Sequence, residues 1–278
     1  MSASISLHFV AALVYSTLGV WLWSQATSPI VRNTLGAAQR ALLTLALLSH
    51  SIAVWQGIWV QQKLYLGWAI ALSAAVCLGF IIFWFQSLSS RIHGLLLILL
   101  PAATLVTLMA AAFPKGHLVP DSNNDWLRIH LIIAFTAYGL IFVAAAHAIL
   151  MAALDKQLHN PVKSSQKESL WNKGLEAMPP LLIQEQLLFQ VIRVGFAVLT
   201  LTVISGAIVS LRISSQLLPF DHKSVFTLLS WITFGVLLWG RQTHGWRGRV
   251  ALRWTLLGFT FIVLAYTGSR FVLDVILS

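Results

Sequence analysis

The segment Gly94–Phe113 reads GLLLILLPAATLVTLMAAAF, twenty residues without a charged side chain. A helix of this length and polarity can cross the hydrocarbon core of a bilayer, where every backbone N–H and C=O must be paired within the segment. In the whole chain 58% of the residues are hydrophobic and 9% are charged, too few to cover the surface of a water-soluble domain of 278 residues. The sequence therefore predicts an integral membrane protein.

Seven more apolar runs accompany this one, and they are separated by turn or charge signals such as Pro114-Lys-Gly116 and Pro179-Pro180. We expect an all-α, polytopic transmembrane helix bundle of about eight spans, forming a single integral-membrane domain over residues 1–278. The longest hydrophilic stretch, residues 155–186, is expected to connect the fifth and sixth spans. The expected spans lie near residues 7–23, 40–59, 65–85, 94–113, 127–154, 187–211, 225–239 and 250–277.

The basic residues predict the orientation of the bundle. The leader MSASIS carries no Lys or Arg, which argues against a cleaved signal peptide and favours an external N-terminus. With eight spans, the inside loops then hold eleven Lys and Arg residues, and the outside loops and tail hold six. The positive-inside rule thus places both termini outside and makes residues 155–186 a cytoplasmic connector.

Charge and composition also exclude several function classes. The formal net charge of +10 is spread over loops and not gathered on one soluble face, which disfavours nucleic-acid binding. Cys77 is the single cysteine, so an intramolecular disulfide and a site held by several cysteines are excluded. We find no nucleophile–base pair, carboxylate dyad or phosphate-binding glycine loop, and we do not expect an enzyme in the usual sense.

Two histidines stand at the expected outer start of a helix. His130 follows Asp125 and His222 follows Asp221, and each aspartate is a candidate N-cap. The positive end of a helix dipole disfavours imidazolium, and a neutral imidazole is the form that binds a metal. Two such imidazoles converging at the outer leaflet would suit the two faces of a haem iron, although spacing alone does not show that they converge.

Arg128 and Lys223 each lie close to one of these histidines and could meet haem propionates through charge-assisted hydrogen bonds. His50 and His147 fall inside spans, where an ionisable group costs about 3 kcal/mol or more without a partner. Each is therefore either functional or part of a helix–helix hydrogen bond, and His50 is our reserve haem ligand. The other histidines are interpreted as interfacial: His8, His93, His117, His159 and His244.

Small residues recur along the sixth expected span. Thr202, Gly206 and Ser210 form a small-xxx-small stripe, which we interpret as a face for close helix packing.

The ordered series of motifs in the second half resembles a known family. The run LVPDSNNDWLRIH that ends at His130, with Ala137-Tyr138 after it, is similar to the external-histidine segment of the CcsA-type cytochrome c assembly proteins, which are integral membrane haem handlers. Residues 195–208 resemble the next family span. Met178-Pro-Pro and Asp221-His-Lys are most similar to the YpjD/HemX-like branch.

The resemblance implies that His130 is the external haem ligand of this chain. The family's motif WGxxWxWD should lie between the sixth and seventh spans, but residues 212–223 contain no tryptophan. The second external histidine, expected after the last span, is also missing from residues 271–277, and His222 could replace it.

As a function, the resemblance implies a bacterial inner-membrane protein that binds or passes b-type haem near the outer leaflet. Its candidate partners are the lipid bilayer, haem, other cytochrome c assembly proteins and an apocytochrome. A transporter of small solutes or metal ions, or its accessory subunit, is the alternative; it would need carboxylates within spans or broken helices. The expected spans contain almost no Asp or Glu.

Overall fold

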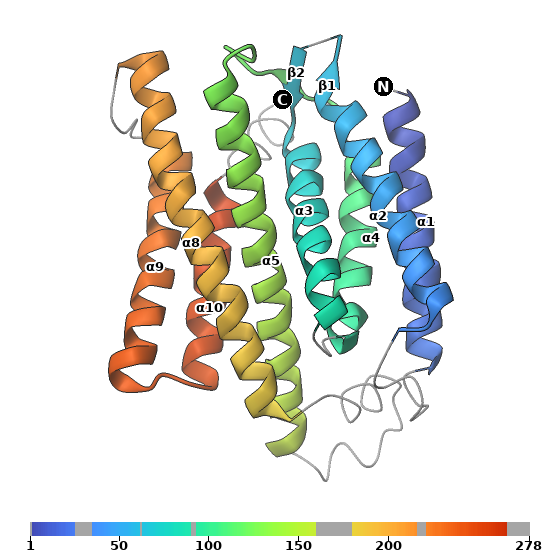
Figure 1. Cartoon of the computed structure of the whole chain (residues 1–278), viewed down its shortest axis with the longest axis vertical. Helices are drawn as coiled ribbons and strands as arrows, with labels where there is room; N and C mark the ends of the chain where they lie inside the picture. Colours follow the sequence, from blue (N-terminus) through green and yellow to red (C-terminus); the bar gives the residue numbers. More distant parts are fainter. Residues whose placement is uncertain are drawn as a thin grey trace.

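The computed structural model describes residues 2–25, 35–61, 63–89, 93–159, 180–215 and 221–265. In this part of the chain there is one α-helix for each expected span, and the helices form an elongated bundle (Figure 1). The all-α polytopic bundle predicted from the sequence is thereby confirmed. The helices are α1 (Ser2–Gln25), α2 (Ala37–Ile58), α3 (Trp68–Ser89), α4 (Leu96–Ala112), α5 (Asp125–His159), α8 (Leu181–Ser214), α9 (His222–His244) and α10 (Arg249–Val263).

Six of these helices, α1, α2, α3, α5, α8 and α9, are long and apolar enough to cross a membrane. The apolar helix α4 is shorter, and the described part of the last expected span is α10. Residues 160–179 of the connector and residues 266–277 of the last span lie outside the described residues. Which face of the membrane each end of the bundle occupies stays a prediction.

Large apolar side chains face outward from several helices. An exposed leucine or isoleucine side chain is unfavourable in water but not in lipid. This outward-facing set is what a bilayer-embedded bundle requires, and its most exposed members include Leu13 at 65%, Val20 at 71%, Leu105 at 60%, Ile132 at 62% and Leu182 at 67%.

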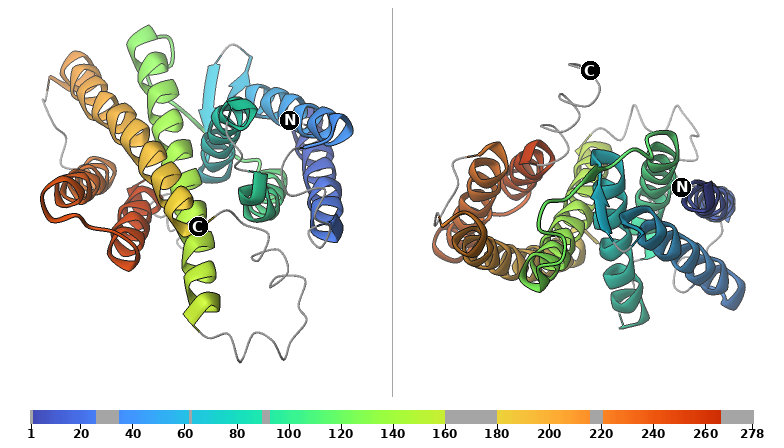
Figure 2. Two further views of the ribbon diagram at one scale, coloured as in Figure 1. Left: turned by 60° about the horizontal axis from the view of Figure 1, so that its bottom comes forward. Right: turned by 90° about the horizontal axis from the view of Figure 1, so that it is seen from above.

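Helix α5 stands between two groups of helices, α1 to α4 on one side and α8 to α10 on the other (Figure 2). It packs along α8 on one flank and α3 on the other. At the α3 contact, Gly79 and Gly139 lie so close that a Cβ on either would collide with the backbone of the opposite helix. Glycine is required at both positions because only backbone fits there.

A small antiparallel sheet, which the sequence analysis did not predict, covers one end of the bundle. It consists of β1 (Trp59–Val60), β2 (Lys63–Leu66) and β3 (His117–Leu118), in the order β1-β2-β3. Tyr65 and Leu66 were expected to begin the third span, but they lie in β2, and α3 begins at Trp68.

The physical reason is an alternation within residues 63–66. Leu64 and Leu66 are buried while Lys63 is exposed, which is the period of two that belongs to a strand. This strand runs almost directly into the apolar helix α3. Its short alternating pattern was therefore predicted as the beginning of the third span. In β2, Leu66 pairs with His117 of β3.

Candidate functional site

A cavity of about 430 Å³ opens at the end of the bundle that carries the sheet. Its walls come from α5, α8, the first turns of α9 and the strand residues Leu66, His117 and Leu118. Apolar side chains such as Leu131, Phe135 and Val203 form most of the surface. The volume lies within the range of natural cofactor and small-molecule sites, about 300–1,000 Å³.

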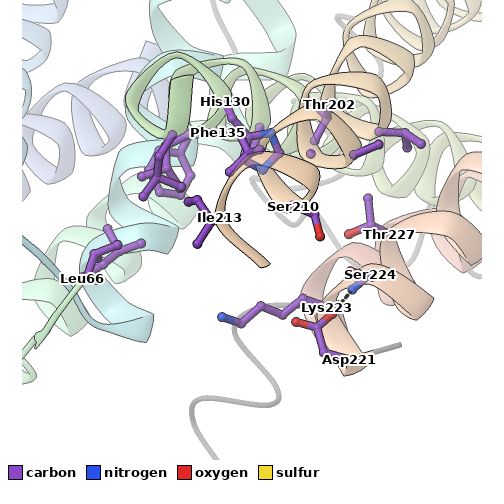
Figure 3. A pocket seen from close by; sticks show the side chains of 18 of the residues that line it. Leu66, His130, Phe135, Thr202, Ser210, Ile213, Asp221, Lys223, Ser224 and Thr227 are labelled. Atoms are coloured by element: carbon purple, nitrogen blue, oxygen red, sulfur yellow. Dashed lines mark hydrogen bonds between the residues drawn. The ribbon is translucent and has the colours of Figure 1, made fainter. Parts of the chain in front are cut away.

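His130 reaches this cavity from the second turn of α5 (Figure 3). Its Nδ1 lies 2.9 Å from Ser205 Oγ on α8. The Ser205 hydroxyl donates its one proton to the Thr202 carbonyl at 3.2 Å, so towards His130 it acts as the acceptor. We therefore assign the proton of the neutral ring to Nδ1. Nε2 then carries the lone pair, and it has no hydrogen-bond partner among the described residues.

The imidazole of His130 lies over Gly206. A Cβ at that position would stand 3.2 Å from His130 Cε1, tighter than most real contacts. Thr202 and Ser210, one turn to either side, line the same cavity. The stripe that we interpreted as a packing face does pack against the His130 ring of α5, and it also forms part of the cavity wall, because its small side chains leave open space beside the ring.

The first turns of α9 form the wall across from His130 (Figure 3). Asp221 caps this helix as predicted, because its Oδ1 accepts the backbone N–H of Ser224 at 2.8 Å. Lys223 and Ser224 both line the cavity. Further along α9, Thr227 lies 3.2 Å from the Tyr138 hydroxyl, and this hydrogen bond joins α9 to α5.

His222 is exposed and does not line the cavity. Consecutive helical residues point about 100° apart, so His222 and Lys223 face different sides of the same turn. Of the residue pair predicted to ligate one iron, the structure brings only His130 to the cavity wall. The pairing of His130 with His222 stays a prediction.

His117 is a cavity residue that the sequence analysis missed. It was interpreted as interfacial, but β3 holds it at the cavity wall. Its placement depends on pairing between β2 and β3, two strands separated by the whole of α3 and α4. No local pattern in the sequence signals that pairing.

Arg128 also differs from its expected placement. It does not line the cavity. Its Nη1 pairs with Asp125 at 3.2 Å, its Nε donates to the Ser122 carbonyl at 2.9 Å, and its guanidinium lies 4.9 Å from the centroid of the Trp59 ring. Asn124 Oδ1 accepts the Trp126 N–H at 3.0 Å, so Asn124 is the cap and Asp125 holds Arg128 instead.

His50 lies elsewhere, fully buried between α1, α2 and α3. Its Nε2 is 2.8 Å from Ser73 Oγ and its Nδ1 is 3.3 Å from the Tyr15 hydroxyl. The Ser73 oxygen is also 3.1 Å from Nε2 of His8, a second fully buried histidine. His8 Nδ1 lies 2.8 Å from the Ser4 carbonyl. His8 was interpreted as interfacial, yet it is part of this internal chain.

A single arrangement of protons satisfies the whole chain. The Ser4 carbonyl only accepts, so neutral His8 donates from Nδ1 and accepts at Nε2 from the Ser73 hydroxyl. His50 must then donate from Nε2 to Ser73 and accept at Nδ1 from Tyr15. Both nitrogens of His50 are thus engaged in bonds between helices. His147, the other histidine inside a span, likewise bonds across helices, with Nε2 2.6 Å from Gln184 Oε1.

The fold and the cavity together define a polytopic membrane protein with a ligand-sized, histidine-bearing cavity at the ends of its helices. The family of cytochrome c assembly proteins matches residues 39–277, and the chain belongs to this family. The resemblance inferred from the ordered motifs is thereby confirmed.

Proteins named YpjD and CcsA are among the relatives of this chain. The chain is 31% identical over 190 residues to the inner membrane protein YpjD of Escherichia coli K12, which covers 68% of each protein. It is 26% identical over 213 residues to the cytochrome c biogenesis protein CcsA of Chlamydomonas reinhardtii, which covers 76% of this chain and 57% of that protein. The CcsA protein of Heterosigma akashiwo is 24% identical over 224 residues, 70% of each chain. No solved structure matches the chain.

Proposed function

We propose that this protein handles haem for cytochrome c assembly in a bacterial inner membrane, and that b-type haem binds in the His130 cavity near the outer leaflet. Membership of the cytochrome c assembly family supports the class of function. The observation that carries the site is the placement of His130 at the wall of a largely apolar cavity, with Nδ1 2.9 Å from Ser205 Oγ and with no hydrogen-bond partner for Nε2 among the described residues.

The residues present fit such a ligand. Haem, when bound, would supply an iron that neutral imidazole nitrogens can ligate. Ser205 orients the ring of His130 in the way that a hydrogen bond on the other nitrogen commonly orients metal-bound histidine. Lys223 lines the cavity, and its ammonium group would donate a charge-assisted hydrogen bond to a propionate. Apolar side chains such as Leu131 and Phe135 would exclude water from the macrocycle.

A second ligand to the haem iron would come from one of two histidines. The sequence predicts His222 as this ligand, because the second external histidine of the CcsA-type proteins is missing from residues 271–277 of this chain. His117 has the advantage of lining the same cavity as His130. Arg128 and His50, which also belonged to the sequence hypothesis, have other hydrogen-bond partners, and we assign them no contact with haem.

The test is an absorption spectrum of the full chain, purified with haem supplied. We expect the split α-band pattern of low-spin, bis-histidine haem in the wild type and its loss in His130→Ala. His244→Ala is the matched control, because His244 is exposed at the far end of α9.

Parallel spectra of His117→Ala and His222→Ala identify the second ligand, since only the variant that lacks it becomes high-spin. If His130→Ala retained haem with an unchanged spectrum, the proposed site would be wrong. If the wild type bound no haem, the proposed function would be wrong. In the described residues no three of His, Cys, Asp and Glu gather around one point, and no specific observation favours a metal-ion transporter.

A further inference from the structure

A second, unrelated groove of about 320 Å³ lies between the last turns of α5 and the first turns of α10. This is the end of the bundle opposite the His130 cavity (Figure 1). The groove has nothing to do with the proposed haem site, because it shares no residue with that cavity.

Each wall of the groove consists of residues that lie on one face of a helix. On α10, Arg249, Leu252, Arg253 and Leu256 recur every three or four residues and share one face. On α5, Ala152 stands one turn before the charged residues at positions 155 and 156. Arg249 is the first residue of α10, and Leu256 lies about 10 Å further along the helix, at 1.5 Å per residue. The charged rim of the groove therefore lies toward the end of the bundle, and the apolar residues Ala152 and Leu256 lie further inside it.

The charges of the groove do not cancel. Lys156, Arg249 and Arg253 carry three positive charges and Asp155 carries one negative charge, so the groove has a formal net charge of +2. Asp155 pairs with Arg249, Oδ2 to Nε at 2.9 Å. Lys156 and Arg253 are exposed, and no carboxylate of the described residues forms an ion pair with either. An anion at the rim would compensate these two cations.

We propose that this groove binds an anionic phospholipid, with the phosphate at Lys156 and Arg253 and an acyl chain along Ala152 and Leu256. Basic pockets between transmembrane helices suit anionic headgroups, and the apolar wall below the cations matches the attached chain. A free phosphate would use the cations but leave the apolar wall unused. A zwitterionic headgroup would bring an amine towards the same cations and bind less well.

The experiment measures lipid retention on the full chain by native mass spectrometry, with phosphatidylglycerol and phosphatidylethanolamine supplied equally. We expect the wild type to retain phosphatidylglycerol preferentially. The double variant Lys156→Gln/Arg253→Gln should bind it roughly 30-fold more weakly, at about 1 kcal/mol for each cation at a lipid surface. The matched control is Arg193→Gln/Arg247→Gln, which removes two exposed charges from outside the groove.

A second variant separates a lipid from a free anion. Ala152→Trp fills the groove from an exposed position and keeps every cation, so this variant should no longer retain phosphatidylglycerol. In a separate competition, inorganic phosphate should fail to displace phosphatidylglycerol from the wild type. Equal retention of the two lipids would overturn the proposal. So would equal weakening in the control pair, unchanged retention in Ala152→Trp, or displacement by millimolar phosphate. Haem spectra of the same samples test the proposed haem site in the His130 cavity independently of lipid binding in the groove.

Discussion

A single hydroxyl determines what His130 can offer to a metal. Ser205 accepts from Nδ1 at 2.9 Å, and this bond selects both the tautomer and the orientation of the ring. We expect Ser205→Ala to weaken haem binding about 10- to 100-fold, the usual effect of losing a hydrogen bond behind a metal ligand. Haem titration followed at the Soret band measures it. Ser210→Ala is the control, because Ser210 lines the cavity without bonding to His130. Equal affinities in both variants would contradict this role.

Gly206 leaves the space that the His130 ring occupies. A Cβ there would press on the His130 ring at 3.2 Å, whereas a Cβ at Gly195 of the same helix would meet Leu140 at an ordinary 3.5 Å. Gly206→Ala should therefore lower haem affinity and Gly206→Val should lower it further, while Gly195→Ala leaves it unchanged. The measurement is the same titration. If Gly206→Val bound haem as the wild type does, the ring would not be the ligand that we infer.

Helices α1, α2 and α3 are joined at the Ser73 hydroxyl. In Ser73→Ala, Nε2 of His8 loses its donor and Nε2–H of His50 loses its acceptor in a fully buried place. Each unsatisfied group costs about 1–3 kcal/mol, so a clear fall in melting temperature is expected. Ser87→Ala on the same helix is the control, because Ser87 bonds only to the Trp84 carbonyl of its own helix. Equal melting temperatures for the two variants would show that the chain does not stabilise the bundle.

The turn between α9 and α10 is held against α8 by one carboxylate. Glu185 pairs with Arg241 and accepts the Gly248 N–H at 3.3 Å, while Arg241 also donates to the Trp246 carbonyl at 3.2 Å. Removing one partner of a poorly exposed ion pair costs about 3–5 kcal/mol, because the other charge is left uncompensated.

We therefore expect Glu185→Ala to lower the melting temperature strongly. Asp125→Ala should change it little, because the Asp125 side chain, which pairs with Arg128, is 83% exposed. Comparable losses in the two variants would mean that burial does not decide the strength of these pairs.

Across the whole molecule, the sequence predicted what depends on local pattern and missed what depends on neighbours. Apolar length located every described helix, because the bilayer imposes it on each segment separately. The sheet was missed because its strands are two to four residues long and because β3 pairs with β2 across the whole of α3 and α4. His130 was predicted from its position at the start of a helix and from its motif. His117 and Ser205 were not predicted, because they approach the cavity or His130 only through tertiary packing, such as that of α5 against α8.

The backbone contact between Gly79 and Gly139 has a consequence for fragments of this protein. It shows that α5 docks onto α3 through a preformed, interlocking surface and not through long side chains that must find each other. Two polypeptides, one ending after β3 and one beginning before α5, should therefore reassemble when co-expressed in one membrane, as two pre-shaped parts. Co-purification of the pair would report this complementation. Gly139→Ala in the second polypeptide should abolish capture of the first, because its Cβ would meet the Ala75 carbonyl of α3, and Gly235→Ala, whose Cβ would meet Phe196 at an ordinary contact distance, should not.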